Sequence, residues 1–276
     1  MAEGRAVGSL YLGTAGWSLP REQWPHFPAA GTHLQRYAAR LFAVEINSSF
    51  YRAHRPATYV RWADGVPPGF RFSVKVPRQI THEARLIGCE ALLEAFLQEC
   101  GHLGEKLGCL LVQLPPSLAY EPDSAEAFFG SLRARHGGFV AFEPRHPSWL
   151  EAEPLLQRMR VARVAADPAP FAEAAEPAGW AGMRYYRLHG SPRVYYSSYE
   201  PDWLERLDAR LAEAPSDVPQ WCIFDNTASG AATANALALD ELRSGDGIRT
   251  ARSGGPIGFG RHKSKRYPGR SAKRLR

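Results

Sequence analysis

Short apolar segments alternate with amphipathic segments eight times along residues 9–243, and this alternation restricts the fold more than any other feature. The apolar segments are rich in Val, Ile, Leu, Phe and Tyr and span residues 9–17, 44–50, 70–77, 107–115, 138–145, 160–167, 183–190 and 220–226. Nearly continuous apolar runs of this kind are typical of parallel strands that are covered on both faces. We therefore expect eight buried strands.

The intervening segments carry apolar residues at helical spacing, as in the sets Leu34, Tyr37, Ala38 and Leu41, and Leu93, Phe96, Leu97 and Cys100. Consecutive parallel strands need a crossover element, so eight strand–helix units predict a parallel sheet. A chain of 276 residues has the length of one closed barrel. No G-x-G-x-x-G or Walker loop follows the first strand, which argues against an open nucleotide-binding sheet. The sequence predicts an α/β fold with a single (β/α)8 TIM-type barrel over residues 1–248.

The formal net charge of +6 is unevenly distributed along the chain. Residues 249–276 hold ten of the 34 Lys and Arg and no Asp or Glu, so the other 24 basic and 28 acidic residues give residues 1–248 a net charge of −4. This terminal segment is rich in Gly, Pro and Ser and has too few aliphatic residues to fold alone, which predicts a disordered basic tail. Two interpretations stay open for it: a solvated chain end, or a tether for nucleic acid.

The chain shows no signal for export or membrane insertion. The N-terminal residues lack the apolar stretch of a signal peptide, and no segment reaches the ~18 apolar residues that span a bilayer. The four cysteines have no C-x-x-C spacing; they are Cys89, Cys100, Cys109 and Cys222. These observations predict a cytoplasmic protein without a membrane partner.

Polar and ionisable residues collect in the C-terminal half of the predicted strands: Glu45, Asn47, Lys75, Gln113, Glu143, Arg145, Asp167, Arg187, His189, Asp225 and Asn226. Barrel active sites are built at that end from several strands. Because side chains alternate along a strand, each of the pairs at 45/47, 143/145 and 187/189 shares a face. Buried charges need partners, so we expect the set to converge in a charged pocket. The alternative is a network of ion pairs that closes the barrel mouth.

Glu45, Glu143, His189 and Asp225 are the candidate catalytic residues. The two glutamates are candidates for general base and acid, since paired carboxylates in different surroundings can hold different pKa values. His189 suits proton transfer or metal binding. A divalent metal held by these four side chains is an alternative on ligand type, but no closely spaced metal motif supports it. No metal ligand is assigned, and the cofactor stays unknown.

Three cations among these carboxylates, Lys75, Arg145 and Arg187, predict a small ligand with a phosphate or carboxylate group. With them, the candidate substrate-binding residues are Trp17, Asn47, Tyr51, Gln113 and Asn226. Aromatic residues crowd the same predicted loops: Trp17, Phe50, Tyr51, Tyr195, Tyr196 and Tyr199. Such rings stack on sugars or bases, or pack loops together.

Eight short motifs are distributed along the chain: GTAGW at 13–17, VEINSSFY at 44–51, FSVK at 72–75, ITH at 80–82, QLPP at 113–116, EPRHPSW at 143–149, RLHG at 187–190 and FDNT at 224–227. Together they resemble the family called domain of unknown function 72, the YecE-like proteins, over residues 10 to about 243. The resemblance implies a TIM-type barrel and no established reaction. Many members have Phe-Asn-Asn where this chain has Phe224, Asp225 and Asn226, which puts Asp225 in doubt as an obligatory acid.

Three functions fit these observations. The first is an enzyme, a hydrolase or lyase acting on a phosphorylated or otherwise anionic substrate in the barrel mouth. The second is a nuclease-like barrel that binds nucleic acid through the basic tail and the mouth aromatics. The third is a non-catalytic module that binds a sugar or metabolite.

Overall fold

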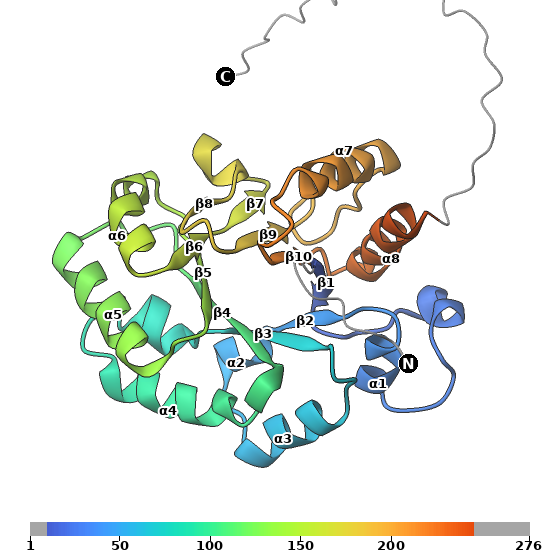
Figure 1. Ribbon diagram of the computed structural model, residues 1–276, viewed down its shortest axis with the longest axis horizontal. Helices are drawn as coiled ribbons and strands as arrows, with labels where there is room; N and C mark the ends of the chain where they lie inside the picture. The colour runs from blue at the N-terminus through green and yellow to red at the C-terminus, as the bar shows by residue number, and fades with distance from the viewer. Residues whose placement is uncertain (1–9, 246–276) are drawn as a thin grey trace, which may run out of the picture.

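Residues 10–245, which the computed structural model describes, form a barrel-shaped sheet with helices packed around its outer face (Figure 1). The strands are β1 (Leu10–Ala15), β2 (Ala43–Ile46), β3 (Arg71–Lys75), β4 (Leu107–Gln113), β5 (Phe139–Glu143), β6 (Val161–Arg163), β7 (Ala165–Asp167), β8 (Ala178–Gly179), β9 (Arg184–Leu188) and β10 (Gln220–Phe224). The α-helices are α1 (His33–Ala38), α2 (Ser48–Tyr51), α3 (Pro56–Asp64), α4 (Glu90–Gly101), α5 (Pro122–Arg135), α6 (Glu153–Arg158), α7 (Pro201–Ala212) and α8 (Ala231–Ser244). Short 3-10 helices are η1 (Arg21–His26), η3 (Gly104–Lys106), η4 (Pro147–Ala152) and η5 (Ala172–Ala175), and η2 (Gln79–Glu83) is a π-helical turn.

The sixth predicted strand closes the barrel because it changes partner halfway. Its first half, β6, pairs with β5, and its second half, β7, pairs with β9. Between them the Val164 amide donates to the Phe142 carbonyl at 2.9 Å. On the other side β10 pairs with β1, so parallel pairing runs round the barrel. Among the described strands, β8 alone is antiparallel, on the edge of β6. The predicted α/β barrel is confirmed.

Two apolar clusters fill the fold, one between the sheet and the helices and a smaller one inside the barrel. In the inner cluster, Tyr11 and Tyr185 stack on Trp221 with ring centroids 4.7 and 5.8 Å away. On β1, Gly13 lies so close to β2 that a Cβ there would meet the Ala43 carbonyl oxygen at 1.9 Å. Large rings therefore occupy the N-terminal half of the barrel, and the C-terminal half is left to polar groups.

Several predicted strands extend too far at their C-terminal ends. The clearest case is 44–50, where β2 stops at Ile46 and a short helix, α2, follows. The Ser49 hydroxyl donates to the carbonyl oxygens of Ile46 and Lys75 at 3.0 and 2.7 Å, which turns the chain back onto the barrel rim. The predicted boundary at residue 248 and the tail at 249–276 lie outside the described residues. Each helix within residues 10–245 is too short or too polar to cross a lipid bilayer.

Candidate active site

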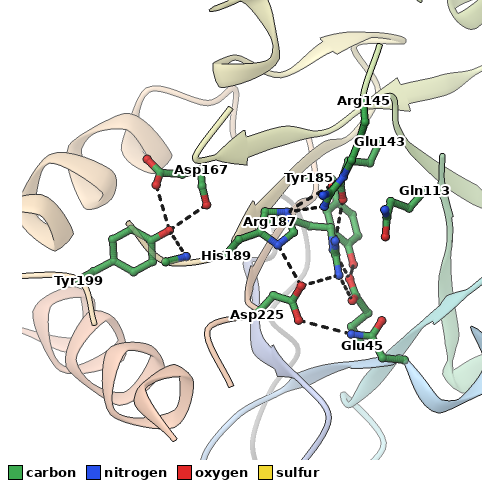
Figure 2. A network of polar contacts seen from close by, with 12 residues as sticks. Glu45, Gln113, Glu143, Arg145, Asp167, Tyr185, Arg187, His189, Tyr199 and Asp225 are labelled. Atoms are coloured by element: carbon green, nitrogen blue, oxygen red, sulfur yellow. Dashed lines mark hydrogen bonds and ion pairs between the residues drawn. The ribbon is translucent and has the colours of Figure 1, made fainter. Parts of the chain in front are cut away.

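Arg187 lies at the centre of a buried cluster of charges at the C-terminal end of the barrel (Figure 2). Its guanidinium donates to both carboxylate oxygens of Glu45 at 2.6 and 3.0 Å, to Glu143 Oε2 at 2.7 Å and to Asp225 Oδ2 at 3.0 Å. All four side chains are less than a tenth exposed. One guanidinium thus serves three carboxylates, and its ordered hydrogen bonds satisfy charges that would otherwise be costly to bury.

Strand geometry explains why these residues meet. Glu45 lies on β2, Glu143 ends β5, Arg187 lies on β9 and Asp225 follows β10 directly. Each side chain points inward at its strand position, and barrel closure brings the four strand ends to one rim. The alternation predicted this convergence, and the structure shows it.

His189 bridges two of these carboxylates. Its Nδ1 lies 3.0 Å from Asp225 Oδ2 and its Nε2 lies 3.3 Å from Glu143 Oε1. Burial alone would lower the pKa of His189, but the charge of Glu143 and the hydrogen bonds to both carboxylates raise it above its ordinary value. With a carboxylate at each nitrogen, the geometry favours the imidazolium form, which donates at both positions.

Two carboxylates of this cluster, Glu143 and Asp225, are held in their charged form. Burial would raise the pKa of Glu143, but Arg187, Arg145 and His189 together hold it well below the ordinary value. Burial likewise acts to raise the pKa of Asp225, and the charge of Arg187 with the hydrogen bond from His189 lowers it instead. Glu143 therefore enters any reaction as a carboxylate, which suits a base or an electrostatic role better than the role of general acid.

Tyr185 and Ser73 belong to the same network but were missed in the sequence. The Tyr185 hydroxyl donates to Glu45 Oε2 at 2.8 Å, and Ser73 Oγ lies 2.9 Å from the same phenol oxygen. Tyr185 precedes Arg187 by two residues on β9, so the alternation that pairs 187 with 189 also places 185 on the inner face. The alternation of side chains along β9 could therefore have identified Tyr185 from the sequence.

Two cations at the mouth keep nitrogen atoms free. Lys75 Nζ makes no hydrogen bond or ion pair within residues 10–245, and it lies 4.2 Å from the Phe50 ring centroid. Burial and the nearby Arg187 lower the pKa of Lys75 to about 8, against the attraction of the carboxylates. Arg145 donates to Glu143 Oε1 through Nε and Nη2 at 3.0 and 2.7 Å, while its Nη1 has no partner in the described chain. Both side chains can therefore accept a further anionic partner.

Two amides lie at the C-terminal ends of the two strands that flank β3, Asn47 directly after β2 and Gln113 at the end of β4. Asn47 Nδ2 lies 3.5 Å from Asp225 Oδ1, and its buried Oδ1 has no hydrogen-bond partner within the described residues. Gln113 stands beside the cluster at the end of β4 without a dashed line to it in Figure 2. The Gln113 side-chain amide nitrogen, Nε2, donates to the Leu114 carbonyl at 3.4 Å. Asn47 Oδ1 can therefore accept a further hydrogen bond at this end of the barrel.

Three of the predicted binding residues are not brought into the charged cluster. Asn226 donates to Ser197 O and to Asn235 Oδ1, both at 2.9 Å, because one residue beyond Asp225 the side chain points to the other face. Tyr51 is 79% exposed on α2. Trp17 is half-buried and packs edge-on against Trp62, with centroids 5.0 Å apart. Their roles in binding stay predictions.

The loop after β9 brings a further ring to the cluster. Tyr195 adopts a left-handed φ of 69°, which residues other than glycine rarely adopt. Its amide donates to the His189 carbonyl at 2.5 Å, and its ring stands edge-on to the His189 ring at 5.9 Å. Behind this loop the Tyr199 hydroxyl donates to Asp167, a pair that stands apart from the Arg187 cluster in Figure 2. Tyr195 thus packs directly on the proton-carrying group of the cluster.

The alternative of a metal centre is not supported by the described residues. Within 10–245, no group of three or more His, Cys, Asp or Glu side chains is arranged to hold a metal ion. The carboxylates proposed as ligands surround Arg187 instead, so a guanidinium takes the position that a metal cation would need. The four cysteines are free thiols and all are buried.

A closed parallel barrel with charged residues at the C-terminal strand ends defines the class of (β/α)8 barrel proteins. Solved structures share this fold. A DUF72 family protein from Enterococcus faecalis has a TM-score of 0.70 and 20% identity, over 87% of this chain and 99% of that chain. A DUF72 family protein from Thermotoga maritima has a TM-score of 0.68 and 24% identity, over 85% of this chain and 99% of that chain.

The chain belongs to the family described as protein of unknown function DUF72, whose pattern matches residues 11–253. It is 32% identical to UPF0759 protein YecE of Escherichia coli over 153 residues, 54% of each chain. It is 29% identical to UPF0759 protein YunF of Bacillus subtilis over 148 residues, 51% of this chain and 52% of the relative. The match thus spans about half the length of these curated relatives. The family resemblance in the motifs is confirmed.

Proposed function

We propose that the protein is an enzyme, a hydrolase or lyase, that acts on a small phosphorylated or otherwise anionic molecule at the barrel mouth. The observation that carries the proposal is the pair of cationic nitrogens left without partners, Lys75 Nζ and Arg145 Nη1, beside carboxylates that are all paired. A network that served only to close the mouth would pair every buried charge. An anionic ligand group would supply the missing hydrogen-bond partner of both nitrogens.

The hydrogen bonds of the site support a finer division of the predicted roles. Arg187 is 1% exposed and committed to three carboxylates, so we assign it to positioning those carboxylates rather than to holding the substrate. Arg145 and Lys75 take the anion-binding role. Glu143, held as a carboxylate, is proposed as the base, with the His189 imidazolium as the proton donor beside it. Donor and acceptor are then 3.3 Å apart in one site.

Thermal denaturation in the presence of inorganic phosphate tests the anion site. A ligand present at 100 times its Kd stabilises the folded state by about 2.7 kcal/mol, so the Tm of the wild-type protein should rise with phosphate concentration. We expect Arg145→Gln to weaken this response about tenfold or more. The matched control is Arg135→Gln on α5, where the arginine forms an exposed ion pair with Glu94; it should respond as the wild type does.

An equal response in the Arg145 variant and the wild type would contradict the proposed site. The catalytic part is tested separately by screening phosphorylated and carboxylated metabolites for turnover. If Glu143→Gln changed neither binding nor turnover in such a screen, the proposed role of Glu143 would have to be abandoned.

A further inference from the structure

Lys75 differs from the other cations of the site in having no anionic partner. Arg187 and Arg145 both form ion pairs with Glu143, at 2.7 Å each. Lys75 Nζ forms none within residues 10–245 although its side chain is 9% exposed, and its described contact is the face of Phe50. The side chain is thus largely removed from water without a paired carboxylate to compensate, which is costly for the ammonium form.

We propose that Lys75 is a catalytic nucleophile whose amine forms an imine with the carbonyl group of a small anionic aldehyde or ketone, with Arg145 holding the anionic group. This inference rests on the proposed function and narrows it to a lyase-type reaction. A desolvated lysine that lies near other cations is a recognised arrangement for an amine nucleophile.

The position of Lys75 suits this chemistry. It is the last residue of β3, at the end of the barrel where catalytic residues project from the strands. The Ser49 hydroxyl donates to its carbonyl at 2.7 Å and fixes the backbone at that point. On one side lies the apolar face of Phe50, and on the other the Arg187 cluster. The nitrogen is therefore held in place while its lone pair remains available.

The protonation state of the amine agrees with this geometry. Burial and Arg187 lower the pKa of Lys75 to about 8. An amine with that pKa is unprotonated in about one molecule in ten at pH 7, whereas an ordinary lysine of pKa about 10.4 is so in fewer than about one in a thousand. The contact with Phe50 favours the ammonium, so both forms are accessible near neutral pH.

The covalent step balances without any external oxidant or reductant. The Lys75 lone pair forms a C–N bond to the carbonyl carbon, and the C–O π electrons move to oxygen. The oxygen then takes one proton from the amine and one from the medium and leaves as water. The protonated imine that remains withdraws electrons from the neighbouring carbon, where a C–C or C–H bond can break. Water later reverses the imine and restores the lysine.

Reductive trapping tests the inference on the full wild-type chain. Glycolaldehyde phosphate is incubated with the protein and sodium cyanoborohydride, and the modified lysines are identified by peptide mass spectrometry. Residues 10–245 contain two lysines, so Lys106, which is half-buried and donates to the Pro67 carbonyl, is an internal control. We expect the adduct on Lys75 to form at least about tenfold faster than on Lys106. Inorganic phosphate should slow the labelling of Lys75 alone.

Two negative results are distinguishable. If phosphate stabilises the protein but Lys75 is labelled no faster than Lys106, the imine is excluded and the anion site stands. If phosphate neither stabilises the protein nor slows labelling, the proposed anion site itself fails, and the inference that rests on it fails with it. Unphosphorylated glycolaldehyde, as the matched uncharged probe, should label Lys75 more slowly than glycolaldehyde phosphate does, because it lacks the anionic group that Arg145 holds.

Discussion

Arg187 and Glu45 are joined by two hydrogen bonds across the barrel interior, although 142 residues separate them in the chain. The paired geometry between a guanidinium and a carboxylate is the strongest form of ion pair available to side chains. The ion pair connects β9 to β2, and these two strands are not neighbours in the sheet. The pair also fixes Arg187 in the position from which it reaches Glu143 and Asp225.

Replacing Arg187 should destabilise the fold strongly. In Arg187→Gln, three buried carboxylates lose their shared partner, and we expect the free energy of unfolding to fall by about 3–5 kcal/mol. Urea denaturation measures this loss. The matched control is Arg243→Gln, which removes a partly exposed ion pair with Asp208 and should cost less than about 1 kcal/mol. Similar losses in the two variants would show that the Arg187 network has no special structural role.

The Tyr185 hydroxyl should contribute a measurable part of this stability. Tyr185→Phe removes the hydrogen bond to Glu45, and a bond to a charged group is worth about 1.5–3 kcal/mol. Tyr11→Phe is the control, because Tyr11 stacks on the same Trp221 ring without a hydrogen bond from its hydroxyl in the described chain. If both phenylalanine variants unfold at the same urea concentration, the Tyr185 bond contributes nothing.

His189 should make stability depend on pH in the neutral range. Its pKa is raised in the folded protein, so the folded state binds the proton more tightly than the unfolded state does. The resulting stabilisation is fully present below the unfolded pKa of about 6.5 and is lost as pH rises through the folded pKa. We expect the free energy of unfolding to decline over that interval in the wild type and to decline less in His189→Gln. An unchanged slope in the variant would contradict the imidazolium assignment.

The basic tail should be separable from the anion site. Every residue of the Arg187 cluster and of the proposed anion site lies between 45 and 225, so a chain ending at Gly247 should keep the full response to phosphate. If the full chain binds duplex DNA through the tail, truncation should weaken binding and flatten its salt dependence, by about 0.9 in slope for each lost phosphate contact. Equal affinity and slope before and after truncation would exclude the tail as a nucleic-acid tether.

Much of the fold and the convergence of the site could be predicted from the sequence, because both follow from simple periodicities. Apolar strand runs and their number predict a closed barrel, and the period of two along β9 places Arg187 and His189 on one face. The same period explains why Asn226, one step beyond Asp225, points toward Ser197 and is not part of the Arg187 cluster.

The partners of each charge could not be predicted, because they depend on which strand ends face one another inside the closed barrel. Nothing local to position 187 distinguishes an arginine that binds three carboxylates from one that binds a ligand. Nothing local to position 75 shows that a lysine among three carboxylates stays unpaired. The short helix α2 was also missed, since the hydrogen bond of Ser49 to Lys75 joins residues 26 positions apart.

The most direct test of the central claim is a crystal structure of the protein soaked with phosphate or tungstate. The charged site predicts electron density for an anion within hydrogen-bonding distance of both Arg145 Nη1 and Lys75 Nζ, with the Arg187 network undisturbed. An anion found only on surface arginines, with the mouth free of it at saturating concentration, would contradict the claim that this end of the barrel binds an anionic ligand.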